Sequence, residues 1–132
     1  MIAFVDTSAF YAVFDADDAN HFRASSEWDR LLEHGASLLT SSYVLVETAA
    51  LLQHRLGMPA VRDFHEDVCP VLMVEWVSQE RHHTAMEAVL VAGRKKLSLV
   101  DCASFQIMRE RAVRTAFCFD RHFREQGFEV RP

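Results

Sequence analysis

Short apolar runs and longer mixed stretches alternate along this chain. Within each short run the apolar residues follow one another without polar interruptions, which is typical of strands buried on both faces of a sheet. Four runs predict strands at residues 2–5, 37–40, 71–77 and 116–119, and a fifth strand is expected at the sheet edge, at 128–130. The first run ends at Asp6 and the fourth at Asp120. Two buried strands are therefore expected to end on a carboxylate.

The mixed stretches between the runs have the end signals of helices. Ser41 or Ser42 can cap a helix at its N-terminus, and a glycine follows three of the stretches, where helices commonly end. Ser98 has Asp101 three residues on, as in a capping box. Helices are predicted just after Asp6 and at residues 20–33, 41–56, 59–70, 78–92 and 98–112.

Strands that alternate with helices form a parallel sheet with helices on both faces. We therefore expect an α/β fold, a three-layer α/β/α sandwich around a mainly parallel central sheet of four to five strands. Residues 1–132 should form one domain, because no linker, repeat or low-complexity segment interrupts them. Ligands of open parallel sheets bind beyond the carboxyl ends of the strands, where Asp6 and Asp120 are expected.

Most aromatic and cysteine side chains are expected in the core. The apolar side of the helix at 20–33 consists of Phe22, Trp28, Leu31 and Leu32. Core positions also suit Phe10, Tyr11, Phe14 and Phe22 better than a base-stacking role does. The cysteines, Cys69, Cys102 and Cys118, form no CxxC pair and are expected as buried small apolar groups, without a disulfide framework or a zinc ribbon.

Charge is distributed unevenly along the chain, whose net charge is −5. Residues 1–92 hold 5 Lys and Arg against 14 Asp and Glu, a balance of −9, whereas residues 93–132 hold 9 against 5, a balance of +4. A polyanion could dock on the C-terminal third, although the whole chain is too acidic for loose binding of nucleic acid. No signal peptide and no apolar run of about 20 residues is seen, so a cytoplasmic protein without membrane contact is expected.

Two further acids join the pair at the strand ends. Glu47 lies in the middle of a predicted helix, with largely apolar residues one turn away on both sides. A carboxylate in such surroundings is costly unless a partner compensates its charge. Asp101 lies in the first turn of its helix, where a carboxylate is favourable. Taken singly, Asp6 and Asp101 could simply cap helices and Asp120 could begin a turn.

Taken together, the four acids favour a metal site. Converging carboxylates repel one another, so either a cation compensates them or some of them are protonated. Oxygen ligands suit Mg²⁺ or Mn²⁺ better than zinc, which prefers His and Cys. Paired ions of this kind orient a water molecule and neutralise charge on a phosphoryl group. The pattern therefore predicts hydrolysis of a phosphodiester.

Four segments, "FVDTSAF", "SSYVLVETAALL", "KLSLVDCASFQIM" and "TAFCFDRHFREQGFEV", resemble the motifs of PIN domains in order and spacing. The chain is most similar to the small, single-domain VapC-type toxins, over essentially its whole length. The resemblance implies a three-layer α/β/α fold and metal-dependent endoribonuclease activity with Mg²⁺ or Mn²⁺. It also implies an RNA substrate, a small antitoxin partner and a homodimer.

The resemblance also assigns roles to individual residues. The metal-binding catalytic acids would be Asp6, Glu47, Asp101 and Asp120. Thr7 or Ser8 would supply a supporting hydroxyl group. Some members carry a further acid one helical turn after the third one, and here Phe105 stands at that position. A second metal ion would therefore be held weakly or recruited with the substrate.

Basic residues near the predicted site are candidates for RNA contact. Arg94, Lys95 and Lys96 precede the helix that carries Asp101, and Arg121 adjoins Asp120. They could meet RNA phosphates, or form a solvated loop and a surface salt bridge. The adjacent His82 and His83 point in different directions on a helix and are expected at the surface, as a poor metal pair.

Other functions remain open at this point. A stand-alone PIN nuclease in RNA processing would carry the same motifs, as would a PIN fold kept for binding only or a DNA nuclease of the flap type. A receiver-like signalling domain also gathers acids around Mg²⁺ at the end of a parallel sheet. A receiver needs a phosphoacceptor Asp after its third strand, and "VLMVEWVSQ" ends without one.

Overall fold

The computed structural model describes residues 1–132 and contains one sheet of five strands. The strands are β1 (Ile2–Val5), β2 (Ser37–Ser41), β3 (Leu72–Glu75), β4 (Thr115–Phe117) and β5 (Glu129–Arg131). Their order is β3-β2-β1-β4-β5, and every neighbouring pair is parallel. The predicted α/β class and parallel sheet are confirmed, and the edge strand is present.

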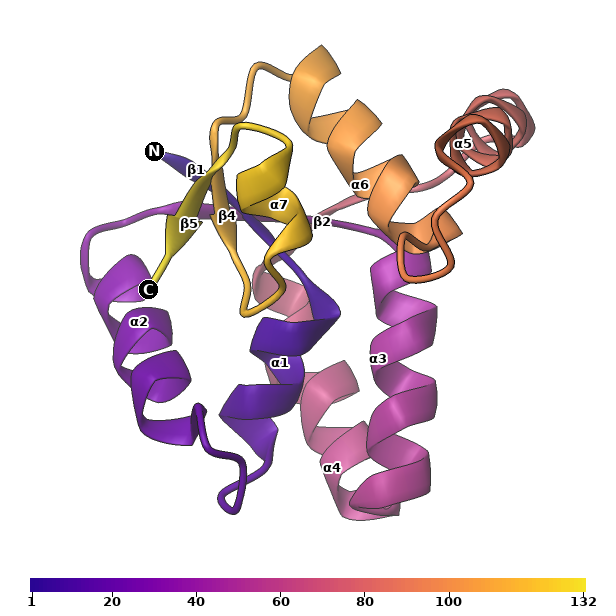
Figure 1. Cartoon of the computed structure of the whole chain (residues 1–132). Coiled ribbons are helices and arrows are strands. Elements are labelled where there is room, and N and C mark those ends of the chain that lie inside the picture. The colour runs from indigo at the N-terminus through magenta and orange to yellow at the C-terminus, as the bar shows by residue number, and fades with distance from the viewer.

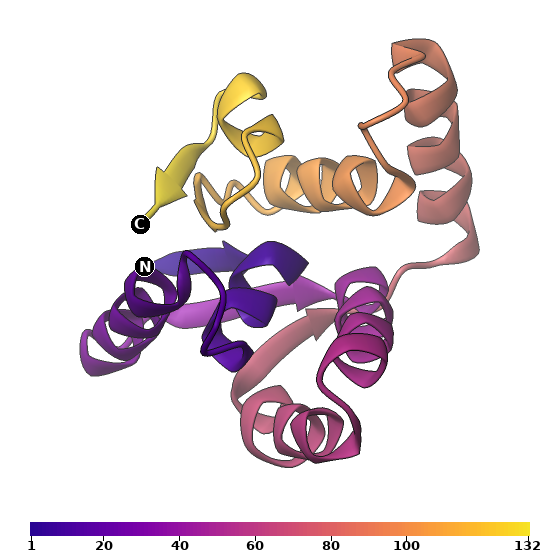
Figure 2. The ribbon, with the colours of Figure 1, turned by 60° about the horizontal axis from the view of Figure 1, so that its bottom comes forward.

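Helices cover both faces of this sheet (Figures 1 and 2). They are α1 (Thr7–Phe14), α2 (His21–Glu33), α3 (Ser42–Arg55), α4 (Met58–Asp63), α5 (Gln79–Ala92), α6 (Leu99–Glu110) and α7 (His122–Glu125). Figure 2 shows α6 and α7 on one side of the strands and α2, α3 and α4 on the other. None of these helices is long and apolar enough to span a bilayer.

The strand order creates a reversal beside β1. From β1 the chain moves to β2 and β3 on one side, then crosses to β4 and β5 on the other. β1 and β4 are neighbours, with Val5 paired to Phe117 near their carboxyl ends. Such a switch point between strands is where open parallel sheets bind ligands. The chain therefore presents its ligand-binding edge directly after β1 and β4.

Some predicted element boundaries were wrong, for identifiable reasons. β4 ends at Phe117 instead of residue 119, because the Phe119 N–H leaves the strand ladder and donates to the Ser8 hydroxyl (3.0 Å). β3 ends at Glu75, and Trp76 beyond it is 74% exposed at the edge of the sheet. The helix expected at 59–70 consists of α4, a π-helical turn and a 3₁₀ turn. The short helix α7 was not predicted.

The core is a cluster of buried apolar side chains around β1 and β4, including Phe4, Phe10 and Phe117. The prediction that Phe22 lies in the core was wrong, because its side chain is 84% exposed. The buried residues of α2 are Ala24, Glu27 and Leu31, and Leu32 is also exposed. Tyr11, Phe14 and Trp28 pack against the core while partly buried. The three cysteines are free; Cys102 and Cys118 are buried and Cys69 is half-buried.

Candidate metal centre

Asp6 lies directly after β1 and caps α1. Its Oδ2 accepts hydrogen bonds from the Ser8 N–H (3.2 Å) and the Ser8 hydroxyl (2.7 Å). The residue is only 4% exposed. Burial raises the pKa of Asp6 to about 7 against the effect of the Ser8 bonds, and the charges of Asp101 and Asp120 add to the rise. Capping fixes the position of Asp6 without neutralising it.

Asp101 is fixed by the predicted capping box at the start of α6. Its Oδ2 accepts from the Ser98 N–H (3.1 Å), while the Asp101 N–H donates to the Ser98 hydroxyl (3.1 Å). The residue is buried. Burial raises the pKa of Asp101, the hydrogen bonds from Ser98 lower it, and the charge of Asp120 raises it further. The helix start and the candidate site thus share one residue.

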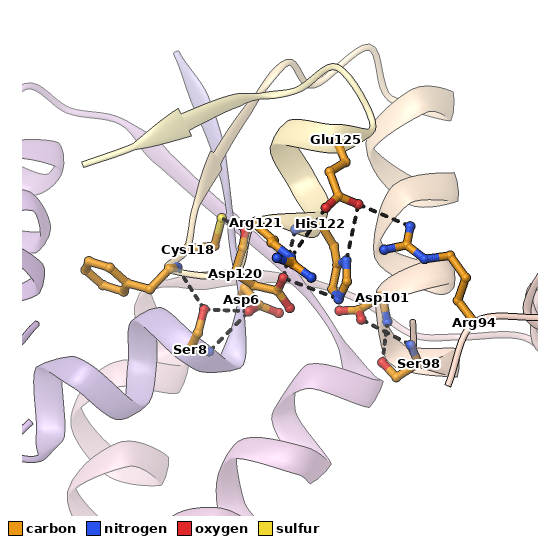
Figure 3. A network of polar contacts seen from close by, with 11 residues as sticks. Asp6, Ser8, Arg94, Ser98, Asp101, Cys118, Asp120, Arg121, His122 and Glu125 are labelled. Atoms are coloured by element: carbon orange, nitrogen blue, oxygen red, sulfur yellow. Dashed lines mark hydrogen bonds and ion pairs between the residues drawn. The ribbon is translucent and has the colours of Figure 1, made fainter. Parts of the chain in front are cut away.

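Asp120 lies in the loop between β4 and α7. Its Oδ1 accepts a hydrogen bond from the His122 N–H (2.8 Å), and its side chain is 29% exposed. The Ser8 hydroxyl links this loop to Asp6, because it accepts from the Phe119 N–H and donates to the Asp6 carboxylate. Figure 3 shows Asp6, Asp101 and Asp120 gathered in one place, from three separate elements.

These three acids share one hydrogen-bonding arrangement. Each uses one carboxylate oxygen to accept from a backbone N–H close by in the sequence, as caps and turns do. The second oxygen of each makes no hydrogen bond within the chain. The interpretation as caps and the interpretation as metal ligands are therefore compatible, since different oxygens carry the two roles.

Glu47 is placed differently from expectation. It is exposed on α3, whereas Val44 on the same helix is buried in the core. Partial burial nevertheless raises the pKa of Glu47, and repulsion from Asp101 and Asp120 contributes. Glu47 is thus close enough to sense the other acids, but the apolar surroundings inferred from the sequence were wrong.

Sequence reasoning gave His122 no role in the site. The ligand atoms of Asp101, Asp120 and His122 all lie within 4.8 Å of one another. The imidazole is buried, with Nε2 3.8 Å from Asp120 Oδ1 and Nδ1 3.6 Å from Glu125 Oε2. His122 begins α7, so its direction depends on the turn at Asp120. The sequence signal was a histidine two residues after a strand-end acid.

The other predicted residues fall into two groups. Of the two hydroxyls, Ser8 contacts Asp6, whereas Thr7 Oγ1 lies 3.1 Å from Thr48 Oγ1 and connects α1 to α3. Of the basic residues, Arg94 and Arg121 both pair with Glu125, at 3.1 and 3.5 Å, while Lys95 and Lys96 are exposed. His82 and His83 lie at the surface, as expected.

The site as a whole concentrates negative charge, and no lysine or arginine is bonded to Asp6, Asp101 or Asp120; His122 is the one basic side chain near them. The available ligand atoms are carboxylate oxygens and one imidazole nitrogen. Hard divalent cations take oxygen ligands, and Mn²⁺ also accepts imidazole. Phe105, at the position where some relatives would have a further acid, is buried against Phe123 and Phe128. The donor set therefore fits a divalent cation, and Phe105 adds no ligand to it.

Comparison with known proteins gives matches over nearly the whole chain. The chain is 36% identical over 131 residues to the 23S rRNA-specific endonuclease VapC20 of Mycobacterium tuberculosis, covering 98% of each protein. The crystal structure of that species' VapC20, described as a sarcin-ricin loop cleaving toxin, superposes with a TM-score of 0.85 at 35% identity and full coverage of both chains.

More distant matches support the fold. FitAcB from Neisseria gonorrhoeae has a TM-score of 0.69 at 13% identity, covering 100% of this chain and 97% of that one. The PIN domain family matches residues 3–129, which leaves no room for the receiver-like alternative. Divalent metal ions are used generally in this family. The chain therefore belongs to the PIN domain family and is a ribonuclease, as its motifs predicted.

Proposed function

We propose that this chain is the toxin of a toxin–antitoxin pair and hydrolyses a phosphodiester bond in the sarcin–ricin loop of 23S rRNA. The main support is the arrangement of Asp6, Asp101 and Asp120 at the switch point of the sheet. In each residue one carboxylate oxygen accepts a hydrogen bond from the backbone and the other accepts none within the chain. The target is suggested by the 36% identical relative. The proposed enzyme is one domain, residues 1–132, acting in the cytoplasm.

Mg²⁺ or Mn²⁺ is the proposed cofactor. Asp101 and Asp120, which group with His122, would hold the metal together with Asp6, whose pKa responds to both of their charges. Glu47 would lie at the exposed side of the site. A bound divalent ion supplies an activated water and stabilises the negative charge that develops on the phosphoryl group. Phe105 contributes no oxygen, so a second ion would depend on ligands from the substrate.

The protein's own contribution is positioning. Ser8 holds Asp6 and the backbone before Asp120 at a fixed separation. Ser98 holds Asp101 at the start of α6. Because these bonds come from rigid element ends, the carboxylates need little rearrangement to meet a cation, and preorganised charge is what accelerates phosphoryl chemistry.

An antitoxin and a homodimer are the proposed protein partners. Support comes from large apolar side chains that are strongly exposed on α3, after β3 and on α5: Val46, Trp76, Leu90 and Val91. In Figure 1, α5 stands at the edge of the molecule beside α6. Contiguous exposed apolar patches mark interaction surfaces, and Leu90 and Val91 are adjacent on α5. Light scattering at micromolar concentration would contradict the dimer if it found monomer alone.

The proposed function is tested with purified protein and two RNAs: a hairpin with the sarcin–ricin loop sequence, and a hairpin of the same length with an unrelated loop. Primer extension should map one cut within the sarcin–ricin loop when Mg²⁺ or Mn²⁺ is present and no cut after EDTA. Equal cutting of both hairpins would contradict the proposed target. A short neighbouring gene for a DNA-binding protein would separate the toxin from a stand-alone nuclease.

A further inference from the structure

A small pocket adjoins the acidic cluster on the side of Asp120. It has a volume of about 200 Å³, and its charged lining residues are Arg23, Asp120, Arg121 and Arg124. Arg23 comes from α2, whereas the other three come from the loop after β4 and from α7. Three arginines and one aspartate therefore line the pocket, and Figure 3 shows Arg121 paired with Glu125 near Asp120.

Two of these arginines have no acidic partner in the chain. Arg23 and Arg124 form no ion pair, in contrast to Arg30 and Arg131, which both pair with Glu27. An arginine whose charge is not compensated within the protein is available to an external anion. The pocket therefore offers positive charge that the fold itself does not use.

Arg23 is also held in place. Its guanidinium lies over the ring of Phe119, 5.6 Å from the ring centroid. The backbone of Phe119 is fixed by its hydrogen bond to Ser8, the residue that also binds Asp6. The cation–π contact orients the guanidinium in advance, so less side-chain entropy is lost when an anion binds. Ser8 thus sets the position of the pocket wall relative to the acids.

We infer that this pocket binds a backbone phosphate of the RNA strand, next to the phosphate that is cleaved. The inference rests on the proposed function and adds Arg23 and Arg124 to the substrate contacts. Asp120 belongs to both the pocket and the acidic cluster, so the two bound phosphates lie on one short stretch of RNA.

The lining favours a phosphate over a base. The side chains of its remaining residues, Cys118, Phe119, Val130 and Pro132, are apolar, and its charged side chains are cationic apart from Asp120. Base edges are distinguished by patterns of donors and acceptors, and a wall of guanidinium donors does not distinguish them. The pocket therefore positions the strand, whereas sequence selection occurs elsewhere.

The test measures RNA binding as a function of salt concentration. The probes are the fluorescent sarcin–ricin hairpin and the unrelated hairpin, with Ca²⁺ replacing Mg²⁺ to prevent turnover. The variants are Arg23→Gln, Arg124→Gln and the double variant. Arg62→Gln is the matched control, because Arg62 is exposed on α4 and makes no ion pair. Thermal melting and Mn²⁺ titration check the fold and the metal centre of each variant.

Each pocket variant should bind both hairpins about tenfold more weakly and lower the slope of log K against log salt by about 0.7 to 0.9, the value for one phosphate contact. Arg62→Gln should stay within about twofold of wild type. Wild-type binding and slope in the double variant would overturn the inference while the proposed function stands. A loss confined to one hairpin, or a changed Mn²⁺ affinity, would also overturn it.

A final outcome separates the two proposals. If the wild-type protein bound neither hairpin at low salt, the proposed function would fail and the inference would fail with it. If wild type binds and cuts RNA, a third hairpin tests the contact directly: its neighbouring linkage is a neutral methylphosphonate. Arg23→Gln and wild type should bind this hairpin equally well, because the charge that Arg23 contacts has been removed. Unequal binding of the two proteins would contradict it.

Discussion

Two carboxylates in this chain are equally buried, but the charged residues around them have opposite signs. Glu27 and Asp6 are each 4% exposed. Glu27 accepts hydrogen bonds from Arg30, at 2.9 and 3.1 Å, and lies 3.5 Å from Arg131. Asp6 accepts only from Ser8, and its charged neighbours are other acids. The fold supplies a counter-charge at one position and withholds it at the other.

This difference separates a structural carboxylate from a proposed metal ligand. Burying a charge costs several kcal/mol of free energy unless a partner compensates it, and Glu27 has two such partners within the chain. At Asp6 the compensation is left to an external cation or to a proton. A buried acid without an internal counter-charge is therefore the stronger indication of a site than burial alone.

The largest expected effect follows from changing the unpaired acid. Asp6→Asn should lower RNA cleavage by about 10³-fold or more, because a proposed metal ligand is lost. Asn still caps a helix, and the change relieves repulsion, so the metal-free variant should melt at an equal or higher temperature. Cleavage rates and calorimetry measure the two effects. Full metal-dependent cleavage by the variant would exclude Asp6 as a ligand.

The second effect concerns pH. Because the folded-state pKa is raised for Asp6, Asp101 and Glu47, the native protein binds more protons than the unfolded chain between about pH 4 and pH 7. The unfolding free energy of the metal-free protein should therefore fall by a few kcal/mol as pH rises through this window, mainly through the buried Asp6. The lowered pKa values of Asp15 and Glu125 act mainly below it.

Denaturant melts in EDTA from pH 5 to pH 8 measure this slope. Asp6→Asn should flatten it, and added Mn²⁺ should restore stability above pH 7 much more than at pH 5, since protons compete with the metal. A metal-free protein whose stability rose steadily from pH 5 to pH 8 would show that the acids are compensated within the chain.

The third effect concerns Glu27, the buried acid that is paired within the chain, and it should change stability instead of activity. Glu27→Gln should lower the unfolding free energy by about 1 to 3 kcal/mol, because the charge that pairs with Arg30 and Arg131 is removed inside the protein. The Nε of Arg131 is already buried without a hydrogen-bond partner, and the only other acid near it is the mostly exposed Glu129, at 4.0 Å. RNA cleavage by the folded variant should be unchanged. Glu33→Gln, an exposed change on the same helix, should stay within about 0.5 kcal/mol.

The smallest expected effect tests the link between the two strand ends. Ser8→Ala removes the hydroxyl that joins Asp6 to the Phe119 backbone. Mn²⁺ affinity should fall by about tenfold, as for other residues that orient metal ligands, and stability by about 1 kcal/mol. Calorimetric titration measures the affinity, with the exposed Ser26→Ala as control. Unchanged Mn²⁺ affinity would mean that the cap N–H alone fixes Asp6.

The parts of the site that could be predicted are those fixed by local signals. Asp6 ends an apolar run, and Asp101 stands three residues after Ser98, so both positions followed from short stretches of sequence. The parallel sheet followed in the same way from alternating runs. Local rules of this kind act through hydrogen bonds between residues that are near neighbours in the chain.

The parts that could not be predicted depend on distant contacts. β4 is short because Phe119 donates to a residue 111 positions away. Phe22 is exposed because α2 turns Glu27 inward, toward an arginine on β5. His122 enters the site because a turn at Asp120 begins α7. Each outcome depends on which side of an element meets another element, which a helical or strand pattern alone leaves open.

The order of the elements along the chain also determines when the acidic cluster is completed during synthesis. β1, β2 and β3, with α1 to α4 packed beside them, are synthesised first and form one contiguous half of the sheet. Asp101 and Asp120 belong to α6 and to the loop after β4, which leave the ribosome later. A nascent chain can therefore fold its first half while its acidic cluster is still incomplete. For an enzyme whose proposed target is ribosomal RNA, the acidic cluster is therefore complete only after residues 101–120 have been synthesised.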